Sequence, residues 1–237
     1  MYDTFYDELK NICIKKDFLI EEYAKTGCKK EYKLYKIVLN PNSTNKRVCF
    51  SAGIHGQEIS GPLGILTFLK KYTPQKSDPV IVILPLANPY GFFKETRKNH
   101  RGIDLNKKFF EKSQPKQIQK IISTIDYEKI DFFITLHEDD EKDGFYIYKY
   151  SSRNGPFNKI IDFLSTKGKI CNEDNIYNNK SDHGIISNPT HDGSFSEWMY
   201  SRGVPLCTCI EIPDKIKLMK RVHIVSELIE YIIRLEI

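Results

Sequence analysis

The sequence predicts an α/β fold in which a mixed, largely parallel sheet carries helices on both faces and residues 1–237 form a single domain. Residues 79–88, PVIVILPLAN, are a continuous β-branched run of the kind found in strands that are covered on both faces. Runs of this type alternate along the chain with segments whose apolar residues have helical spacing. Such alternation indicates a largely parallel sheet, because each crossover helix packs on a face of the sheet.

Each expected strand is a short apolar or alternating run that is bounded by turn residues or polar residues. The segment YKLYKIVLN alternates between apolar and polar residues, and the turn cluster NPNSTN follows it. The segment DFFITLH is apolar almost throughout and therefore indicates a buried strand. We expect strands at residues 32–40, 46–53, 79–88, 131–140, 144–150 and 204–213.

Helices are expected where apolar residues recur every three or four positions. Residues 3–24 have this spacing and are expected to form one or two opening helices. Further helices are expected at residues 59–72, 113–127, 155–167, 192–203 and 214–237. Residues 89–110 are expected to form a long functional loop, and residues 171–193 a polar excursion without regular structure.

Charge and composition restrict the class of protein. The 36 basic residues are interleaved with 31 acidic ones, so the net charge of +5 argues against a nucleic-acid partner. No stretch reaches the ~18 apolar residues of a membrane span, which argues against a membrane protein. The six cysteines have no CxxC pair, and the first residues do not resemble a signal peptide. We therefore expect reduced thiols and a cytoplasmic location.

Polar clusters follow several of the expected strands, at the sheet edge where sites of α/β proteins form. The segment SAGIHGQEISG places His55 and Glu58 three residues apart, so that both side chains can reach one point. His137, at the end of another strand, is the natural third ligand of a zinc site. Taken singly, His55 is equally compatible with a hydrogen-bonded loop position, and His137 suits a hydrogen-bonded strand end better than a metal site.

The order of the motifs resembles the zinc carboxypeptidase (M14) family. The segments HGQE, NPYGFFKETRKNHRGIDLNKKF, ITLH and DGSFSEWMYSRGVPLCTCIEIP follow one another as the corresponding motifs do in that family, between about residues 46 and 213. The stretch TRKNHRGIDLN is similar to short bacterial members such as murein peptide amidases. The related succinylglutamate desuccinylases and aspartoacylases share the same kind of zinc site. The resemblance implies an α/β sheet with helices on both faces.

The resemblance also implies roles for individual residues. His55, Glu58 and His137 would bind one zinc ion per chain, and the pattern leaves a second metal ion open. Arg97 would polarise the scissile carbonyl group and stabilise the oxyanion. Glu211 would be the general base that activates water and later protonates the leaving amine.

Two further positions concern the substrate, for which the resemblance implies a small peptide or peptide-like molecule with a free carboxylate. Asn106 would help to hold that carboxylate. Lys107 stands where the family has arginine, so the carboxylate clamp is weaker or differently shaped, since lysine lacks the bidentate fork. Arg101 is a candidate contact for an acidic substrate and equally a candidate surface residue.

Residues near these motifs have less specific expectations. Glu138 is a candidate for orienting the ligand His137, whereas Asp139 and Asp140 are expected in a solvated loop. Carboxypeptidases have a tyrosine upstream of the GSFSEW-like segment, but residues 181–193 contain none. His183 or His191 could line the site instead, although an ordinary loop position suits each of them better.

Three functions are consistent with these residues. The leading hypothesis is a zinc metallopeptidase of the carboxypeptidase type that hydrolyses an amide bond next to a free carboxylate. The second is an N-acyl amino acid amidohydrolase similar to succinylglutamate desuccinylase or aspartoacylase. The third is a non-catalytic binding domain on a degenerate peptidase scaffold, which only Lys107 favours.

Overall fold

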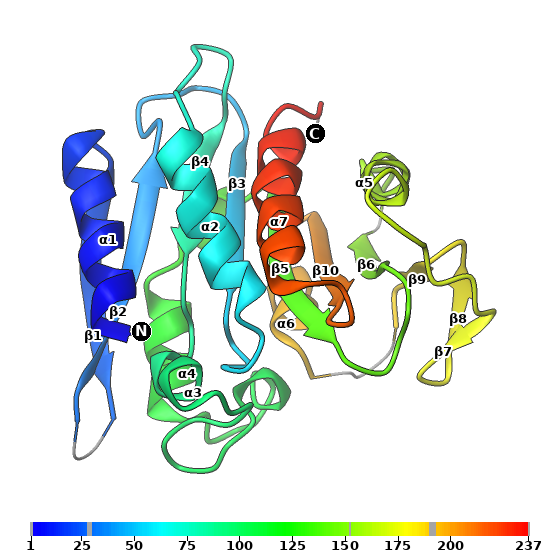
Figure 1. Cartoon of the computed structure of the whole chain (residues 1–237), viewed down its shortest axis with the longest axis horizontal. Coiled ribbons are helices and arrows are strands. Elements are labelled where there is room, and N and C mark those ends of the chain that lie inside the picture. The colour runs from blue at the N-terminus through cyan, green and yellow to red at the C-terminus, as the bar shows by residue number, and fades with distance from the viewer. Residues whose placement is uncertain (1, 28–29, 152, 190–192, 237) are drawn as a thin grey trace.

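The computed structural model describes residues 2–27, 30–151, 153–189 and 193–236. Its helices are α1 (Tyr2–Lys15), α2 (Ser60–Lys71), α3 (Pro89–Lys94), α4 (Lys116–Ser123), α5 (Phe157–Ser165), α6 (Phe195–Ser201) and α7 (Leu218–Ile232), with 3₁₀ turns at Leu105–Lys107 and Tyr127–Lys129. Its strands are β1 (Leu19–Thr26), β2 (Tyr32–Leu39), β3 (Arg47–Ala52), β4 (Val80–Leu84), β5 (Phe132–Asp139), β6 (Tyr146–Ser151), β7 (Asn175–Ile176), β8 (Asn179–Asp182), β9 (Ile185–Ser187) and β10 (Leu206–Pro213). These strands form one sheet with the order β1-β2-β4-β3-β5-β10-β6-β9-β8-β7 (Figure 1).

The middle of the sheet is parallel and its flanks are mixed, as the sequence predicts. Strands β4, β3, β5 and β10 run in the same direction, whereas β2 pairs antiparallel with β4 and β6 pairs antiparallel with β10. The chain goes from β3 to β4 on one side and later returns to β5 on the other side of β3. Sites of open α/β sheets form at such a switch point, beyond the carboxyl ends of the strands.

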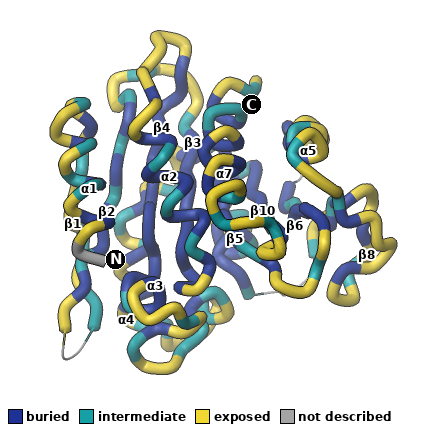
Figure 2. The backbone as a smooth tube through the Cα atoms, viewed as in Figure 1, coloured by how far each residue is buried: buried dark blue, intermediate teal, exposed yellow. Residues whose placement is uncertain are grey.

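Two hydrophobic cores lie on the two faces of the sheet. On one face, Val48 and Phe50 of β3 pack into a core with residues of α1, α2, α5 and α7, and these helices lie in front of the sheet in Figure 1. On the other face, Cys49 packs into a core with residues of α4 and α6. Successive residues of a strand point to opposite faces, so a continuous apolar run fills both cores. The central strands are accordingly buried throughout (Figure 2).

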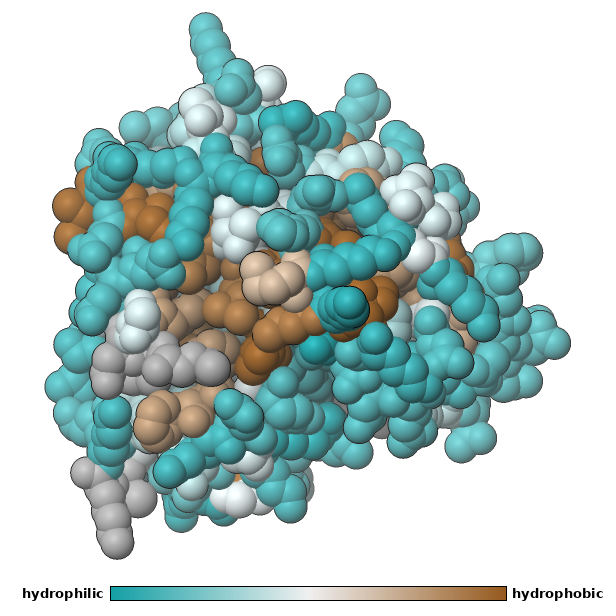
Figure 3. Space-filling model, in the orientation of Figure 1, coloured by the Kyte–Doolittle hydropathy of each residue, from teal (hydrophilic) through white to brown (hydrophobic). Residues whose placement is uncertain are grey.

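The helix-covered surface is largely hydrophilic, with hydrophobic side chains gathered near its middle (Figure 3). In the described part of the chain, no helix is long and apolar enough to cross a membrane. The described cysteines are buried thiols, namely Cys13, Cys49, Cys171, Cys207 and Cys209, and Cys28 lies outside the described residues. Burial raises the pKa of the Cys13 and Cys49 thiols, to about 11 and about 12 respectively, so these two act as small apolar side chains.

Most of the expected elements are present, but three expectations were wrong. Residues 19–24 belong to strand β1, because the chain leaves α1 at Lys15 and turns through Asp17, whose φ is +56°. The expected loop 89–110 contains helix α3 and a 3₁₀ turn. The polar excursion 171–193 contains strands β7, β8 and β9, which are too short and too polar for their alternation to be recognised.

Candidate metal centre and active site

His55 and Glu58 lie in the turn that connects β3 to α2. The backbone N–H of Glu58 donates a hydrogen bond to the carbonyl oxygen of His55 at 3.3 Å, which closes the turn. The turn packs directly on α3, since a Cβ atom at Gly56 would lie 1.9 Å from the carbonyl carbon of Gly91. Glycine is therefore required at position 56, because any side chain there would overlap the backbone of α3.

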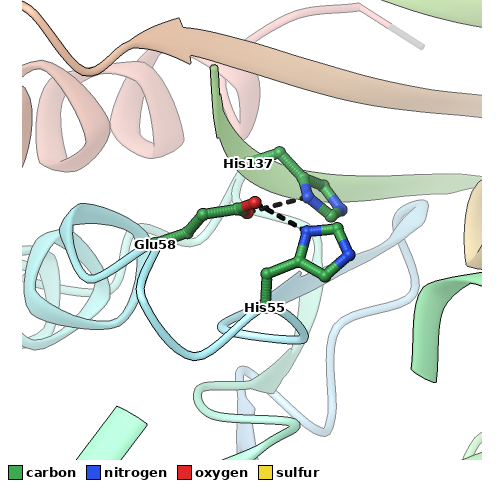
Figure 4. Close-up of side chains that lie close together, drawn as sticks. All are labelled: His55, Glu58 and His137. Carbon is green, nitrogen blue, oxygen red and sulfur yellow. Dashed lines mark hydrogen bonds and ion pairs between the residues drawn. The ribbon is translucent and has the colours of Figure 1, made fainter. Parts of the chain in front are cut away.

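His55, Glu58 and His137 converge on one point beyond the carboxyl ends of β3 and β5 (Figure 4). Glu58 Oε1 lies 2.6 Å from His55 Nδ1, and Glu58 Oε2 lies 2.9 Å from His137 Nδ1. The two imidazole rings are 4.9 Å apart between their centroids. All three residues are buried, with exposed fractions of 3–4%. Three potential ligand atoms are thus held together away from solvent.

The chemistry of this cluster suits a metal cation. Glu58 Oε2 is buried, and its close neighbour His137 Nδ1, at 2.9 Å, does not meet hydrogen-bonding geometry, so a cation would satisfy this oxygen. Burial alone would raise the pKa of Glu58, but the nearby charges of His137 and His55 outweigh burial and lower it to about 2. Two imidazole nitrogens and a carboxylate are a ligand set that zinc accepts. Metal-binding groups must be deprotonated, and Glu58 already is.

Asp104 connects the metal ligand candidate His55 to Arg97, a contact that the motif reading missed. Asp104 Oδ1 lies 3.2 Å from His55 Nε2, and Asp104 Oδ2 accepts a hydrogen bond from Arg97 Nε at 2.8 Å. Burial opposes ionisation, but contacts with His55 and Arg97 lower the pKa of Asp104 below its usual range. The available signal was the position of Asp104 inside the quoted segment GIDLN, two residues before Asn106.

Glu211 lies beside the cluster on β10. Its Cα is paired with that of His137 on β5 and with that of Tyr146 on β6. Burial raises the pKa of Glu211 to about 7, although the charge of His137 acts in the opposite direction. Cys209 Sγ donates a hydrogen bond to Glu211 Oε1 at 3.3 Å. His137, Cys209 and Glu211 also form a second group of potential metal ligands.

A pocket of about 560 Å³ opens above these residues. Of the residues singled out in the sequence, those that line it are His55, Glu58, Arg97, Asn106, Lys107, His137, Glu138, Asp139, Asp140 and Glu211. Arg97 Nη1 lies 3.7 Å from Glu58 Oε1. Asn106 Oδ1 accepts a hydrogen bond from the backbone N–H of Phe195 at 3.1 Å, which fixes the orientation of the amide. Arg101 does not line this pocket but lies in another one, between β1 and α4.

The acidic residues after His137 have separate roles. The Glu138 carboxylate accepts hydrogen bonds from Ser60 N at 2.7 Å and Arg221 Nη1 at 2.8 Å, and among the described residues it forms no hydrogen bond with the imidazole ring of His137. Asp139 is buried, contrary to the expected solvated loop, because its carboxylate accepts hydrogen bonds from Tyr146 and Tyr177. Asp140 is exposed, as expected.

Tyrosines line the pocket although none is present in residues 181–193. Tyr146, Tyr148 and Tyr177 lie on its wall, and Tyr177 comes from the turn between β7 and β8. Sequence reasoning missed Tyr177 because the two strands around it are short and polar. His183 is exposed and pairs with Asp182 away from the pocket lining, whereas His191 lies outside the described residues.

The comparison with protein families decides where this chain belongs. A sequence model of the succinylglutamate desuccinylase/aspartoacylase catalytic domain matches residues 44–169, which include His55, Glu58 and His137. The chain belongs to the succinylglutamate desuccinylase/aspartoacylase family. Membership of this family indicates a hydrolase. No curated protein sequence matches the chain.

Solved structures share the fold of this family member. A candidate metallopeptidase from Shewanella amazonensis is similar with a TM-score of 0.86 and 23% identity, over 95% of this chain and 90% of that chain. A murein-tripeptide amidase from Escherichia coli O157 is similar with a TM-score of 0.66 and 16% identity, over 92% of both chains. A candidate carboxypeptidase A from Shewanella denitrificans gives a TM-score of 0.70 at 13% identity, over 96% of this chain and 68% of that chain. These neighbours agree with the resemblance to zinc carboxypeptidases.

Proposed function

We propose that the protein is a cytoplasmic zinc-dependent hydrolase of the carboxypeptidase type, which cleaves an amide bond next to a free carboxylate in a small peptide or peptide-like molecule. The observation that carries the proposal is the convergence of His55, Glu58 and His137 with Glu211 in one pocket. The family match and the peptidase and amidase neighbours support the same reaction class. The presence of both metal ligands and a base argues against a non-catalytic binding domain.

His55, Glu58 and His137 would hold the zinc ion. When bound, zinc lowers the pKa of a water ligand toward ~7 and polarises a carbonyl oxygen. Glu211 accepts a proton from the attacking water and passes it to the amine nitrogen that leaves, so the carboxylate ends the cycle as it began. In the protein without metal, desolvation raises the pKa of the half-buried Glu211 to about 7, in the range where a carboxyl group can both accept and donate a proton.

Arg97 stabilises the negative charge that develops on the carbonyl oxygen. Its Nε is held by Asp104, while its Nη1 faces the ligand cluster at 3.7 Å from Glu58 Oε1. A cation that is fixed before the reaction stabilises the transition state without a cost of reorganisation. Asn106 and Lys107 line the same pocket and would receive the carboxylate of the substrate.

Replacing Glu211 by Gln tests this assignment. The variant should bind zinc with the stoichiometry of the wild type, since Glu211 is outside the proposed ligand set. It should lose activity by about 10²–10⁴-fold, because the proton acceptor is gone. Elemental analysis of the purified protein and a peptidase assay measure the two effects, and an undiminished rate would refute the role of Glu211.

A second candidate function is favoured by the family match, namely hydrolysis of N-acyl amino acids. The same zinc ligands and base would serve it, so only the substrate separates the two candidates. We expect zinc-loaded protein to hydrolyse dipeptides or murein tripeptide with a higher kcat/KM than N-succinylglutamate or N-acetylaspartate. The reverse preference would make the amidohydrolase the correct assignment.

A further inference from the structure

A second pocket lies beside the loop that carries Arg97 and Asp104 but does not share lining residues with the candidate active site. It has a volume of about 530 Å³ and lies between the end of β1, the loop 99–101 and the start of α4. Its lining includes Lys25, His100, Arg101, Lys116 and Lys120, and no acidic residue among those described. Three separate segments of the chain therefore bring basic side chains to one cavity.

The side of this pocket formed by Asn99 and Gln117 is ordered by buried amides. Gln117 Oε1 accepts hydrogen bonds from Thr26 Oγ1 at 3.1 Å and Asn99 Nδ2 at 3.3 Å. Gln117 Nε2 donates to the carbonyl oxygen of Ala87 at 2.8 Å. Asn99 Oδ1 accepts from the backbone N–H of Arg101 at 2.9 Å, which sets the turn on which Arg101 stands. These hydrogen bonds order the backbone from which Arg101 and Lys116 extend, without the help of a ligand.

Part of the positive charge at the pocket lacks a partner. Lys25 pairs with Glu31 at 3.0 Å, and Lys120 Nζ donates to the carbonyl oxygen of Lys25. Arg101 and Lys116, in contrast, form no ion pair with any residue in the described ranges and are exposed. An anion that binds between them would therefore not have to displace an internal carboxylate.

The start of helix α4 supplies further donors at the pocket. Helix α4 begins after Pro115 without a side-chain cap, and its first-turn residues Lys116 and Gln117 line the pocket. The first N–H groups of a helix have no partner inside the helix, and its dipole favours negative charge there.

We propose that this pocket binds a small phosphate-bearing anion, either free phosphate or the phosphate group of a small metabolite. The guanidinium group of Arg101 comes from the loop 99–101, whereas the ammonium group of Lys116 and the helix N-terminus both come from the start of α4. The several oxygens of a phosphate group can satisfy all of them. The ligand would also hold the catalytic loop, because Arg101 is three residues before Asp104 and Asn99 Oδ1 accepts from Ile103 N at 3.1 Å.

Isothermal titration of the zinc-loaded protein with inorganic phosphate tests the proposal, and glycerol 3-phosphate in a parallel titration distinguishes free from esterified phosphate. The double variant Arg101→Gln/Lys116→Gln should bind the better of these probes at least about tenfold more weakly, since it loses two charge-assisted contacts. The matched control Lys98→Gln/Lys112→Gln has the same change of net charge at exposed positions outside the pocket, and should bind as the wild type does.

A third variant identifies binding at the wrong site. If phosphate bound in the candidate active site, Lys107→Gln would weaken binding and the double variant would not, and this result would overturn the proposal. An equal loss in the double variant and its control would also overturn it, because the effect would then be one of net charge. The proposal would also be overturned if the wild type bound neither phosphate nor glycerol 3-phosphate.

Hydrogen exchange of the wild type gives a second measurement that needs no variant. Added phosphate should slow the exchange of backbone amides in residues 99–103 and 116–119, where the proposed ligand lies. Protection confined to the turn 55–58 and to residues near His137 would place the anion at the metal cluster and contradict the proposal.

Discussion

Glu211 illustrates how the site depends on single residues. The side chain is half-buried next to His137, and desolvation outweighs the attraction of that histidine, so the pKa of Glu211 is raised to about 7 in the protein without metal. A positive ion on His55, Glu58 and His137 would lower this pKa, since an opposite charge favours the carboxylate. The charge state of Glu211 therefore depends on both pH and metal binding.

The pH profile of activity should follow this group. A base must be deprotonated, so kcat/KM should rise with pH through an acidic limb whose midpoint lies at or below about 7. Initial rates of the zinc-loaded protein across the acidic range measure the limb. A profile that is flat throughout that range would contradict the assignment, and Glu211→Gln should lose the limb together with the activity.

Asp104 should contribute to zinc binding indirectly, because it contacts the proposed ligand His55 and Arg97. Replacing it by Asn keeps the size of the side chain but removes the charge that faces His55 Nε2 and Arg97 Nε. We expect zinc affinity to fall by about 10–100-fold, as is usual when the partner of a ligating histidine is lost. Competition with a chromogenic chelator measures the affinity. Asp143, which forms an exposed ion pair with Lys215, offers the control Asp143→Asn. An equal loss of zinc affinity in both variants would refute a specific role of Asp104.

At the scale of elements, an ion pair between Glu138 and Arg221 connects strand β5 with helices α2 and α7 next to the site. Glu138, at the end of β5, accepts from the first residue of α2 and from Arg221 of α7. The side chains of Glu138 and Arg221 are only 6% and 12% exposed. Burial raises the pKa of Glu138 despite these contacts, which indicates that its charge is costly to bury. The pair fixes how α2 and α7 sit against the strand that carries His137.

Replacing Arg221 by Met should destabilise the protein by about 3–5 kcal/mol, because it leaves a buried carboxylate without its partner. The exposed pair of Arg234 and Glu230 supplies the control, and Arg234→Met should cost no more than about 1 kcal/mol. Denaturant unfolding of both variants gives the two free energies. Equal costs would mean that Glu138 does not depend on Arg221.

The position of a strand in the sheet explains whether the sequence predicted it correctly. The strong apolar runs predicted β3, β4, β5 and β10 correctly, because a strand covered on both faces must be apolar along its whole length. Strand β1 was taken for a helix because it lies at the sheet edge, where its residues are exposed or half-buried and show no clear alternation. Strands β7 and β8 hold Tyr177 at the pocket but have too few residues to show a period.

At the scale of the whole molecule, the switch point of the sheet brings distant segments into one site. His55 and Glu58 follow β3, His137 ends β5, and Glu211 lies on β10, so neighbouring parallel strands supply the ligands and the base. A metal held by these ligands would connect two strand ends that are about eighty residues apart in sequence. That residues 1–237 act together as one catalytic domain stays a prediction.

Metal removal should therefore be visible in stability. A ligand that binds only the folded state stabilises it by about 2.7 kcal/mol at a hundredfold excess over Kd, so chelation should lower Tm and added zinc should restore it. Thermal unfolding followed by circular dichroism measures the shift. In Glu58→Gln the shift should be largely lost, whereas a shift of unchanged size would mean that zinc stabilises the protein elsewhere.

The sequence by itself determined the α/β class and the apolar central strands, and it singled out the proposed ligands His55, Glu58 and His137, because these depend on local periodicity and on motifs in a set order. Only the tertiary structure decided the rest. In the folded chain, Arg101 lines a separate basic pocket, and Asp139 is buried where it accepts hydrogen bonds from two tyrosines. Asp104 lies between His55 and Arg97 and contacts both. The physical reason is that such contacts join residues on different loops, whose directions are set by packing against the sheet rather than by their neighbours in sequence.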